Sequence, residues 1–348
     1  MIQTGVIKMS QKQIVFTKLN TAELLDVDVN PLNDNMVRVK TYFSSISCGT
    51  EKANITGDLN VNIADAPAKE AVFPRTSGYS SSGVVVEIGK NVKNFNVGDR
   101  VVMSWSQHKE YNDMVENNLV KIEDDNISFE EAALCHIGTF PMAAVRKVKL
   151  EIGESAMVMG LGILGLFGVM FARCQGAYPV IAVDPVKERR EKALKMGADF
   201  AFDPFDDDFV KKVKDVTGGG VNAAIEVTGV GAGLNQCLDC MARFGRVSLL
   251  GCTRDKNFTV DYYRKVHGPG ISIIGAHTHA RPSFESHHGY FTQQDDIKAI
   301  LKLISGKRIN LKDVIDETYS PKNCTKVYTQ LINDKNFPNI VQFDWSEI

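Results

Sequence analysis

The pattern of hydrophobic and polar positions changes near residue 128. Before that point, short apolar stretches are separated by clusters of Asn, Gly, Asp and Pro, which is typical of β-strands joined by turns. The stretches predicted as strands are 13–19, 36–44, 81–89, 100–105 and 118–124. They predict a small, barrel-like β domain. A helical stretch then begins at Ser128, which is spaced from Glu131 as in a capping box.

Beyond residue 155, strand-like and helix-like segments alternate. The predicted strands are 156–159, 179–183, 199–202, 222–227, 246–250 and 271–276, and the predicted helices include 187–196 and 209–217. This alternation indicates a doubly wound parallel sheet with helices on both faces. The rest of the chain is too short for a core of its own, so we expect it to return to the first domain. The predicted fold class is α/β plus β, with an α/β domain at 137–276 inserted between 1–136 and 277–348 of a substrate domain.

A glycine pattern lies where the first strand of the α/β domain meets a helix. The order is Gly160-Leu-Gly162-Ile-Leu-Gly165. The first glycine permits a tight turn, the second lets a pyrophosphate approach the backbone, and the third lets the helix pack on the strand. The phosphates would then lie at a helix N-terminus, where free N–H groups favour negative charge. This predicts a Rossmann dinucleotide site that includes Gly160, Gly162, Ile163, Leu164 and Gly165.

The same region has an alternative interpretation. Residues 156–172 form an uncharged apolar run close to the length of a transmembrane helix. The glycine spacing, together with the strands on either side, favours the nucleotide-binding turn.

Asp184 lies nineteen residues after Gly165, at the end of the second predicted strand. A carboxylate at this separation binds the hydroxyls of the adenosine ribose and repels a 2′-phosphate. We therefore expect NAD(H) to be favoured over NADP(H). Lys187, Arg189 and Arg190 follow, and they are either a phosphate-tolerant cluster or a solvated helix face.

Composition restricts the class of partner. Forty Lys and Arg against forty-two Asp and Glu give a net charge of -2, which offers no attraction for nucleic acid or an anionic membrane. The N-terminus lacks the features of a signal peptide. The chain has seven cysteines, an odd number, which does not indicate a framework of disulfide bonds. We expect a cytoplasmic protein whose partner is a small molecule.

Three further motifs carry a family resemblance. They are Gly83–Gly89 with Gly98-Asp99-Arg100-Val101, Glu226-Val-Thr-Gly229, and Gly245–Gly251. With the glycine-rich turn, they make the chain similar over nearly its whole length to the medium-chain dehydrogenase/reductase superfamily, the relatives of zinc alcohol dehydrogenase. The resemblance implies a GroES-like substrate domain formed by both ends of the chain, cofactor contacts at Thr228, Gly251 and Ala276, and a homodimer or homotetramer.

The family's zinc motifs are only partly present. By the resemblance, Cys48-Gly49-Thr50-Glu51 supplies a zinc-ligand cysteine, a hydroxyl for proton relay and a carboxylate behind the metal, and Cys135 is another ligand. Relatives have Gly-His-Glu where this chain has Gly78-Tyr79-Ser80, and the cysteine lobe of the structural zinc is missing. The Cys-Gly-Thr-Glu and Gly-Tyr motifs resemble those of a subgroup that includes bacteriochlorophyllide dehydrogenase-like proteins. We expect catalytic and structural zinc to be absent, with Cys48 and Cys135 as ligands if the catalytic zinc is bound.

Two further clusters leave alternatives open. His277, His279, His287 and His288 follow the last predicted strand, and they either contact a polyhydroxylated or anionic substrate or form a polar surface loop. Cys237 and Cys240 are either a redox or metal pair or, as the predicted helix favours, part of a buried face.

The sequence therefore predicts an NAD(P)-dependent oxidoreductase that interconverts a secondary alcohol and a carbonyl, such as a polyol or sugar derivative. The candidate catalytic residues are Cys48, Thr50, Glu51, Tyr79, Cys135, His136 and His277. One alternative is zinc-free, NADPH-dependent reduction of quinones or enones. The other is a nucleotide-binding sensor without catalysis.

Overall fold

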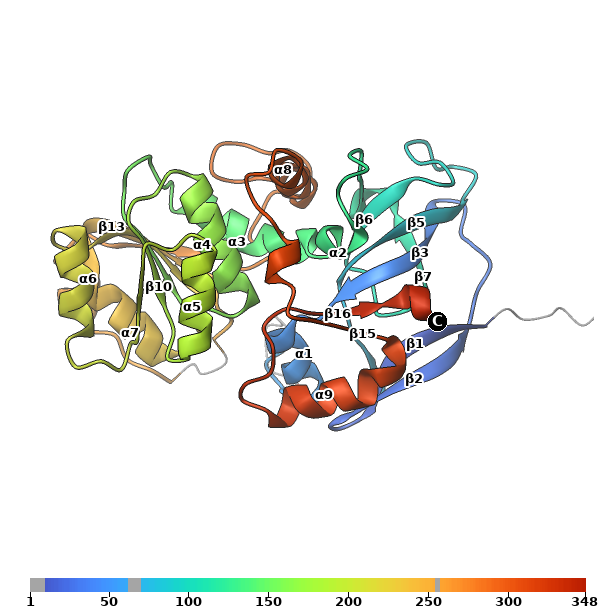
Figure 1. The fold of residues 1–348 in the computed structure, drawn as a ribbon, viewed down its shortest axis with the longest axis horizontal. Coiled ribbons are helices and arrows are strands. Elements are labelled where there is room, and N and C mark those ends of the chain that lie inside the picture. Colours follow the sequence, from blue (N-terminus) through green and yellow to red (C-terminus); the bar gives the residue numbers. More distant parts are fainter. Residues whose placement is uncertain (1–9, 62–69, 254–256) are drawn as a thin grey trace, which may run out of the picture. The chain divides into compact units, whose positions relative to one another are not determined.

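The computed structural model describes residues 10–61, 70–253 and 257–348 (Figure 1). The chain divides into two compact units. One unit contains the chain up to His136 together with Ile297–Ile348, and the other contains Ile137–Asp296. Both ends of the chain thus belong to one unit, and the other unit is inserted between them.

The unit with both ends of the chain is rich in β-strands. One sheet has the order β15-β16-β3-β5-β6-β8 with β7 paired to β3, and a second has the order β2-β1-β4. The strands are β1 (Ser10–Lys18), β2 (Thr21–Asp28), β3 (Met36–Ser45), β4 (Arg75–Thr76), β5 (Ser80–Ile88), β6 (Arg100–Ser104), β7 (Tyr111–Val115), β8 (Leu119–Lys121), β15 (Glu317–Tyr319) and β16 (Val341–Asp344). Strand β16, from the last part of the chain, pairs antiparallel with β3.

Helices and a shared core hold the two ends of this unit together. The helices are α1 (Cys48–Ile55), α2 (Phe129–Ala132), α8 (Gln293–Ser305, of which the unit holds the part from Ile297) and α9 (Cys324–Asn333). Side chains from β1, including Ile14 and Phe16, pack in one buried cluster with Tyr328, Phe343 and Trp345 from the last part of the chain. The predicted capping box of Ser128 and Glu131 is confirmed at the start of α2.

The inserted unit is built on six parallel strands in the order β11-β10-β9-β12-β13-β14. The strands are β9 (Ala156–Met159), β10 (Val180–Val183), β11 (Phe200–Phe202), β12 (Val221–Glu226), β13 (Met241–Leu249) and β14 (Ser272–Gly275). The helices are α3 (Cys135–Lys147, of which the unit holds the part from Ile137), α4 (Ile163–Cys174), α5 (Lys187–Lys195), α6 (Phe209–Thr217) and α7 (Gly231–Asp239). Helices α4 and α5 pack on β9 to β11, whereas α7 packs on β12 and β13 (Figure 1). The predicted fold class is confirmed.

The apolar run at 156–172 is divided by its glycines. Strand β9 ends at Met159, and helix α4 begins at Ile163. In the described part of the chain, no helix has the length and apolar character needed to cross a membrane.

Residues 277–296 belong to the inserted unit, whereas the sequence pattern assigns them to the substrate domain. Ionic contacts explain the difference, because Arg281 and Arg146 both pair with the buried Asp296 carboxylate, at 3.2 and 3.0 Å. Such contacts between distant charged residues leave no trace in the hydrophobic pattern.

Candidate active site

The glycine-rich turn connects β9 to α4 at the carboxyl end of the strand. The Gly160 N–H donates to the carbonyl of Val183 at 2.7 Å, which ties the turn to β10. A Cβ added at Gly165 would lie 1.8 Å from the Gly160 carbonyl oxygen, so this close approach requires glycine. At Gly162, an added Cβ would meet open space, which leaves the backbone accessible to a ligand. The local geometry is that of a phosphate-binding turn.

Asp184 lies directly after β10 and is buried. Its carboxylate accepts hydrogen bonds from the N–H groups of Leu161 and Val186, each at 2.8 Å. The Arg189 guanidinium lies 3.8 Å from the same carboxylate. Asp184 thus fixes the glycine-rich turn, and a neighbouring cation offsets its charge.

The other predicted cofactor residues follow neighbouring strands of the same sheet. Thr228 follows β12, Gly251 follows β13, and Ala276 follows β14. Thr228 donates its N–H to Glu226 at 2.8 Å, and Ala276 donates to the Leu249 carbonyl at 3.0 Å. Because the carboxyl ends of parallel strands meet at one edge, the structure brings these residues to the edge that holds the glycine-rich turn.

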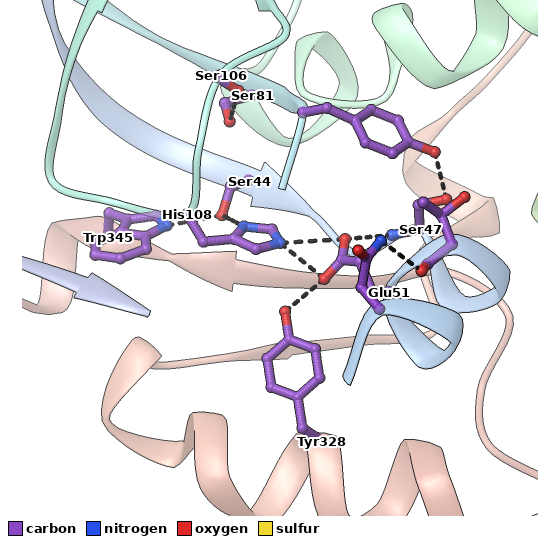
Figure 2. A network of polar contacts seen from close by, with 11 residues as sticks. Ser44, Ser47, Glu51, Ser81, Ser106, His108, Tyr328 and Trp345 are labelled. Atoms are coloured by element: carbon purple, nitrogen blue, oxygen red, sulfur yellow. Dashed lines mark hydrogen bonds and ion pairs between the residues drawn. The ribbon is translucent and has the colours of Figure 1, made fainter. Parts of the chain in front are cut away.

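In the other unit, Glu51 on α1 is the centre of a buried polar network (Figure 2). The carboxylate accepts from the Ser47 N–H at 2.8 Å, from the Tyr328 hydroxyl, and from His108 Nε2 at 3.1 Å. Burial and the adjacent Glu51 carboxylate raise the pKa of Tyr328 well above its ordinary value, so Tyr328 keeps its proton as a donor.

The second nitrogen of His108 completes this network. His108 Nδ1 lies 2.7 Å from the Ser44 hydroxyl, and that hydroxyl accepts from Trp345 Nε1 at 2.8 Å (Figure 2). Ser44 can then donate its own proton to Nδ1, which leaves an Nε2–H to donate to Glu51. Sequence reasoning missed His108, Tyr328 and Trp345, since they come from distant segments that carry no recognisable motif.

Tyr79 and His136 are brought together by the fold. Their rings lie 5.6 Å apart between centroids, and the Trp105 ring lies 4.8 Å from His136. The Tyr79 hydroxyl bonds to the Ser47 hydroxyl at the start of α1, and Thr50 lies in the first turn of that helix. His136 is buried, whereas Tyr79 is partly exposed. Tyr79 therefore has the greater access to a ligand.

The two predicted zinc-ligand cysteines have different surroundings. The Cys48 sulfur lies 3.7 Å from the Asn339 carbonyl oxygen, whereas the fully buried Cys135 thiol donates to the Glu131 carbonyl at 3.7 Å. Burial, with a contribution from Glu131, raises the pKa of Cys135, which opposes the thiolate form that binds metal. Among the described residues, no three His, Cys, Asp or Glu side chains are grouped to hold a metal ion. The arrangement does not fit a three-ligand zinc, so we derive no chemical step through one.

Comparisons with known proteins assign the two units to a family. Residues 33–149 match the alcohol dehydrogenase GroES-like domain, and residues 164–306 match zinc-binding dehydrogenase. The chain is 31% identical to L-threonine 3-dehydrogenase of Pyrococcus horikoshii, over 77% of this chain and 83% of the relative. It is 30% identical to (R,R)-butanediol dehydrogenase of Bacillus subtilis, over 81% of this chain and 88% of the relative.

A solved structure shares the fold. The crystal structure of 2R,3R-butanediol dehydrogenase from Bacillus subtilis has a TM-score of 0.80 at 23% identity, covering 96% of this chain and 99% of the other. The chain is thus an oxidoreductase with a GroES-like domain and a Rossmann-type sheet, which carries out NAD(P)-dependent oxidoreduction of alcohols. It belongs to the zinc-dependent medium-chain dehydrogenase/reductase superfamily.

The family corrects the cofactor expectation. The matched family is zinc-binding dehydrogenase, so a catalytic zinc is expected, and the prediction that it is absent is wrong. That prediction depended on Tyr79, which lies where relatives have a histidine. The two family models nevertheless match most of the chain, and one changed motif is weaker evidence than those matches. The comparisons leave the choice between NAD and NADP open, and the Arg189 guanidinium beside Asp184 offsets part of the charge on which the preference for NAD depends.

Proposed function

We propose that this enzyme reversibly oxidises a secondary alcohol in a small polyol or hydroxylated substrate. The carboxyl edge of the parallel sheet supports this proposal, because the glycine-rich turn and Asp184 contact each other there. The relatives support the substrate class, since the names L-threonine 3-dehydrogenase and (R,R)-butanediol dehydrogenase both denote oxidation at a secondary alcohol.

In this proposal, the dinucleotide lies along that edge. Backbone N–H groups at the start of α4 would bind the pyrophosphate, and Asp184 would bind the adenosine ribose. The proposed cofactor-binding residues are Gly160, Gly162, Ile163, Leu164, Gly165, Asp184, Thr228, Gly251 and Ala276.

Oxidation removes a hydride from the carbinol carbon and a proton from its hydroxyl. A bound nicotinamide would accept the hydride, and a side chain would accept the proton. Tyr79 is the proposed first partner of the substrate hydroxyl in the GroES-like unit, because it is partly exposed and its own hydroxyl is bonded to Ser47. Thr50 is a further candidate for proton transfer, and His277 is a candidate hydrogen-bond partner of the substrate oxygen. His136 is fully buried beside Tyr79 and Trp105, which suits it to holding these rings in place.

A turnover screen tests the function. Purified enzyme is given polyols, sugars, aldehydes, quinones and enones with NAD(H) or NADP(H), and the absorbance of the reduced nicotinamide is followed. We expect turnover of secondary alcohols and of the matching ketones, strongly reduced in Tyr79→Phe. Turnover of quinones or enones alone would contradict the proposal.

We further propose a homodimer through β14, with a homotetramer as the alternative. Strand β14 is the outermost strand at one end of the six-stranded sheet, and its Ile273 side chain is 40% exposed. An apolar strand edge of this kind is usually paired or covered. Light scattering should give at least twice the chain mass, whereas a monomeric mass at micromolar concentration would contradict this arrangement.

A further inference from the structure

A buried lysine forms hydrogen bonds to the turn that contains His277. Lys147, the last residue of α3, is 3% exposed. Its ammonium donates to the carbonyl oxygen of Gly275 at 3.1 Å and also to that of Ala280. These two carbonyls lie on either side of His277 in the sequence, so one cation holds both ends of the segment that follows β14.

A second cation holds the same turn. Arg281 donates through Nε to the Thr278 carbonyl at 3.0 Å and through Nη2 to the Thr139 carbonyl on α3 at 2.9 Å. Its remaining contact is the buried Asp296 carboxylate at 3.2 Å. The turn is thus anchored to α3 by two cations that are themselves buried.

The backbone of this turn also selects one form of the His277 ring. The N–H of His279 donates to His277 Nδ1 at 3.2 Å. A backbone N–H can only donate, so Nδ1 must carry a lone pair and the ring proton must lie on Nε2. The His277 carbonyl in turn accepts from the Ala280 N–H at 2.8 Å, which closes the turn.

The charges near His277 favour the same neutral form. Partial burial lowers the pKa of His277, and the neighbouring His279 and the Lys147 ammonium lower it further. The charged and aromatic groups at this turn also include the Arg281 guanidinium, the Asp296 carboxylate that pairs with it, and the Tyr290 ring, which lies 5.6 Å from the Lys147 ammonium. The Asp296 carboxylate pairs with both Arg281 and Arg146, so these two guanidinium groups offset its negative charge.

We propose that Lys147 is a positioning residue for His277. Lys147 holds the His277 ring at the carboxyl edge of the sheet, where the ring donates its Nε2–H to the oxygen atom of the alcohol or carbonyl substrate. This assignment rests on the proposed function for its substrate. The His277 ring stabilises the substrate oxygen atom by donating a hydrogen bond to it, and the ring does not accept a proton at Nδ1. Lys147 acts only through His277.

Nitrogen NMR of the full chain, without cofactor or substrate, tests this inference. The shifts of the two His277 ring nitrogens, assigned with His277→Gln, report the tautomer and the pKa. We expect the Nε2–H tautomer in the wild type. In Lys147→Met, we expect the His277 titration midpoint to move upward, because a nearby positive charge is lost. Lys147→Arg keeps the charge and should stay near the wild type, as should the control Lys195→Met on the exposed face of α5.

Two results would overturn the inference. One is a wild-type His277 with its proton on Nδ1, and the other is an unchanged midpoint in Lys147→Met. The wild-type tautomer decides the matter even if Lys147→Met does not fold. Because no turnover is measured, a failure here is distinct from a failure of the proposed alcohol oxidation. If both hold, Lys147→Met should lower kcat and shift its pH profile, whereas Lys195→Met should change neither.

Discussion

Glu51 and His108 lie 57 positions apart in the sequence, and their side chains meet at 3.1 Å in a fully buried network. The pair connects helix α1, which carries Cys48 and Thr50, to the segment that precedes β7. Tyr328 and Trp345 add the last part of the chain to the same network. The network therefore fixes the start of α1 from several directions.

Removing His108 should strongly destabilise the enzyme. His108→Leu leaves the Glu51 carboxylate buried without one of its donors, and leaving a buried acceptor without its partner in this way lowers the free energy of unfolding by about 1–3 kcal/mol. Urea unfolding followed by circular dichroism measures the change. The control is His288→Leu at an exposed position, which should have little effect. Adding Glu51→Gln to His108→Leu should recover part of the loss, and a double variant no more stable than His108→Leu would refute the pairing.

Gly78 should tolerate no side chain. Its φ is +88°, and a Cβ there would lie 2.7 Å from the His108 backbone nitrogen. Gly98 is a matched control, since its φ is +96° and an added Cβ meets open space. Both alanine variants carry backbone strain, but only Gly78→Ala also carries the clash, which we expect to remove a further ~1–3 kcal/mol of stability. Equal thermal stability of the two variants would show that His108 is not held against Gly78.

The Asp296 carboxyl should make stability depend on pH. Burial, only partly offset by Arg281 and Arg146, raises its pKa from the ordinary 3.8 to about 6. Between these values the folded state holds the proton more tightly than the unfolded state, so stability falls as pH rises from 3.8 to about 6. The difference in unfolding free energy between the wild type and Asp296→Asn should therefore decline across this range. A flat or rising difference would contradict the raised pKa.

Asp184→Ala should weaken dinucleotide binding. The variant removes the acceptor of the Leu161 N–H in the glycine-rich turn and the proposed partner of the ribose. Loss of one hydrogen bond to a charged group is worth about 1.5–3 kcal/mol, which corresponds to roughly tenfold or more in the dissociation constant. Calorimetric titration with NADH and with NADPH measures both affinities. Asp207→Ala, at an exposed site, is the control. Unchanged binding in Asp184→Ala would remove Asp184 from the cofactor site.

Local patterns predicted the parts of the fold that depend on short spacings. The glycines of the turn after β9 lie within six positions, and helix α6 has the bounds that its apolar periodicity indicates. The favoured interpretation of Cys237 and Cys240 is also confirmed, since both are buried at the end of α7, and burial raises the pKa of Cys240 to about 12.

Contacts between distant residues could not be predicted in this way. Glu51, His108 and Tyr328 meet only after strands from both ends of the chain have paired, and neither His108 nor Tyr328 belongs to a recognisable spacing. The hydrogen bonds from Lys147 to the turn after β14 could not be predicted from the sequence either, because they join a side chain to backbone carbonyls more than a hundred positions away. The prediction that the catalytic zinc is absent was wrong for a related reason, because it was inferred from one local motif and not from the whole chain.

Isotope transfer tests the central claim most directly. The enzyme is incubated with NAD⁺ or NADP⁺ and with 2,3-butanediol, L-threonine or a hexitol, each carrying deuterium at the secondary carbinol carbon. Mass spectrometry of the nicotinamide then follows the label. We expect deuterium in the reduced cofactor with at least one of these secondary alcohols, and less of it with Tyr79→Phe. A protein that binds the dinucleotide but transfers no deuterium from any of these alcohols would contradict it.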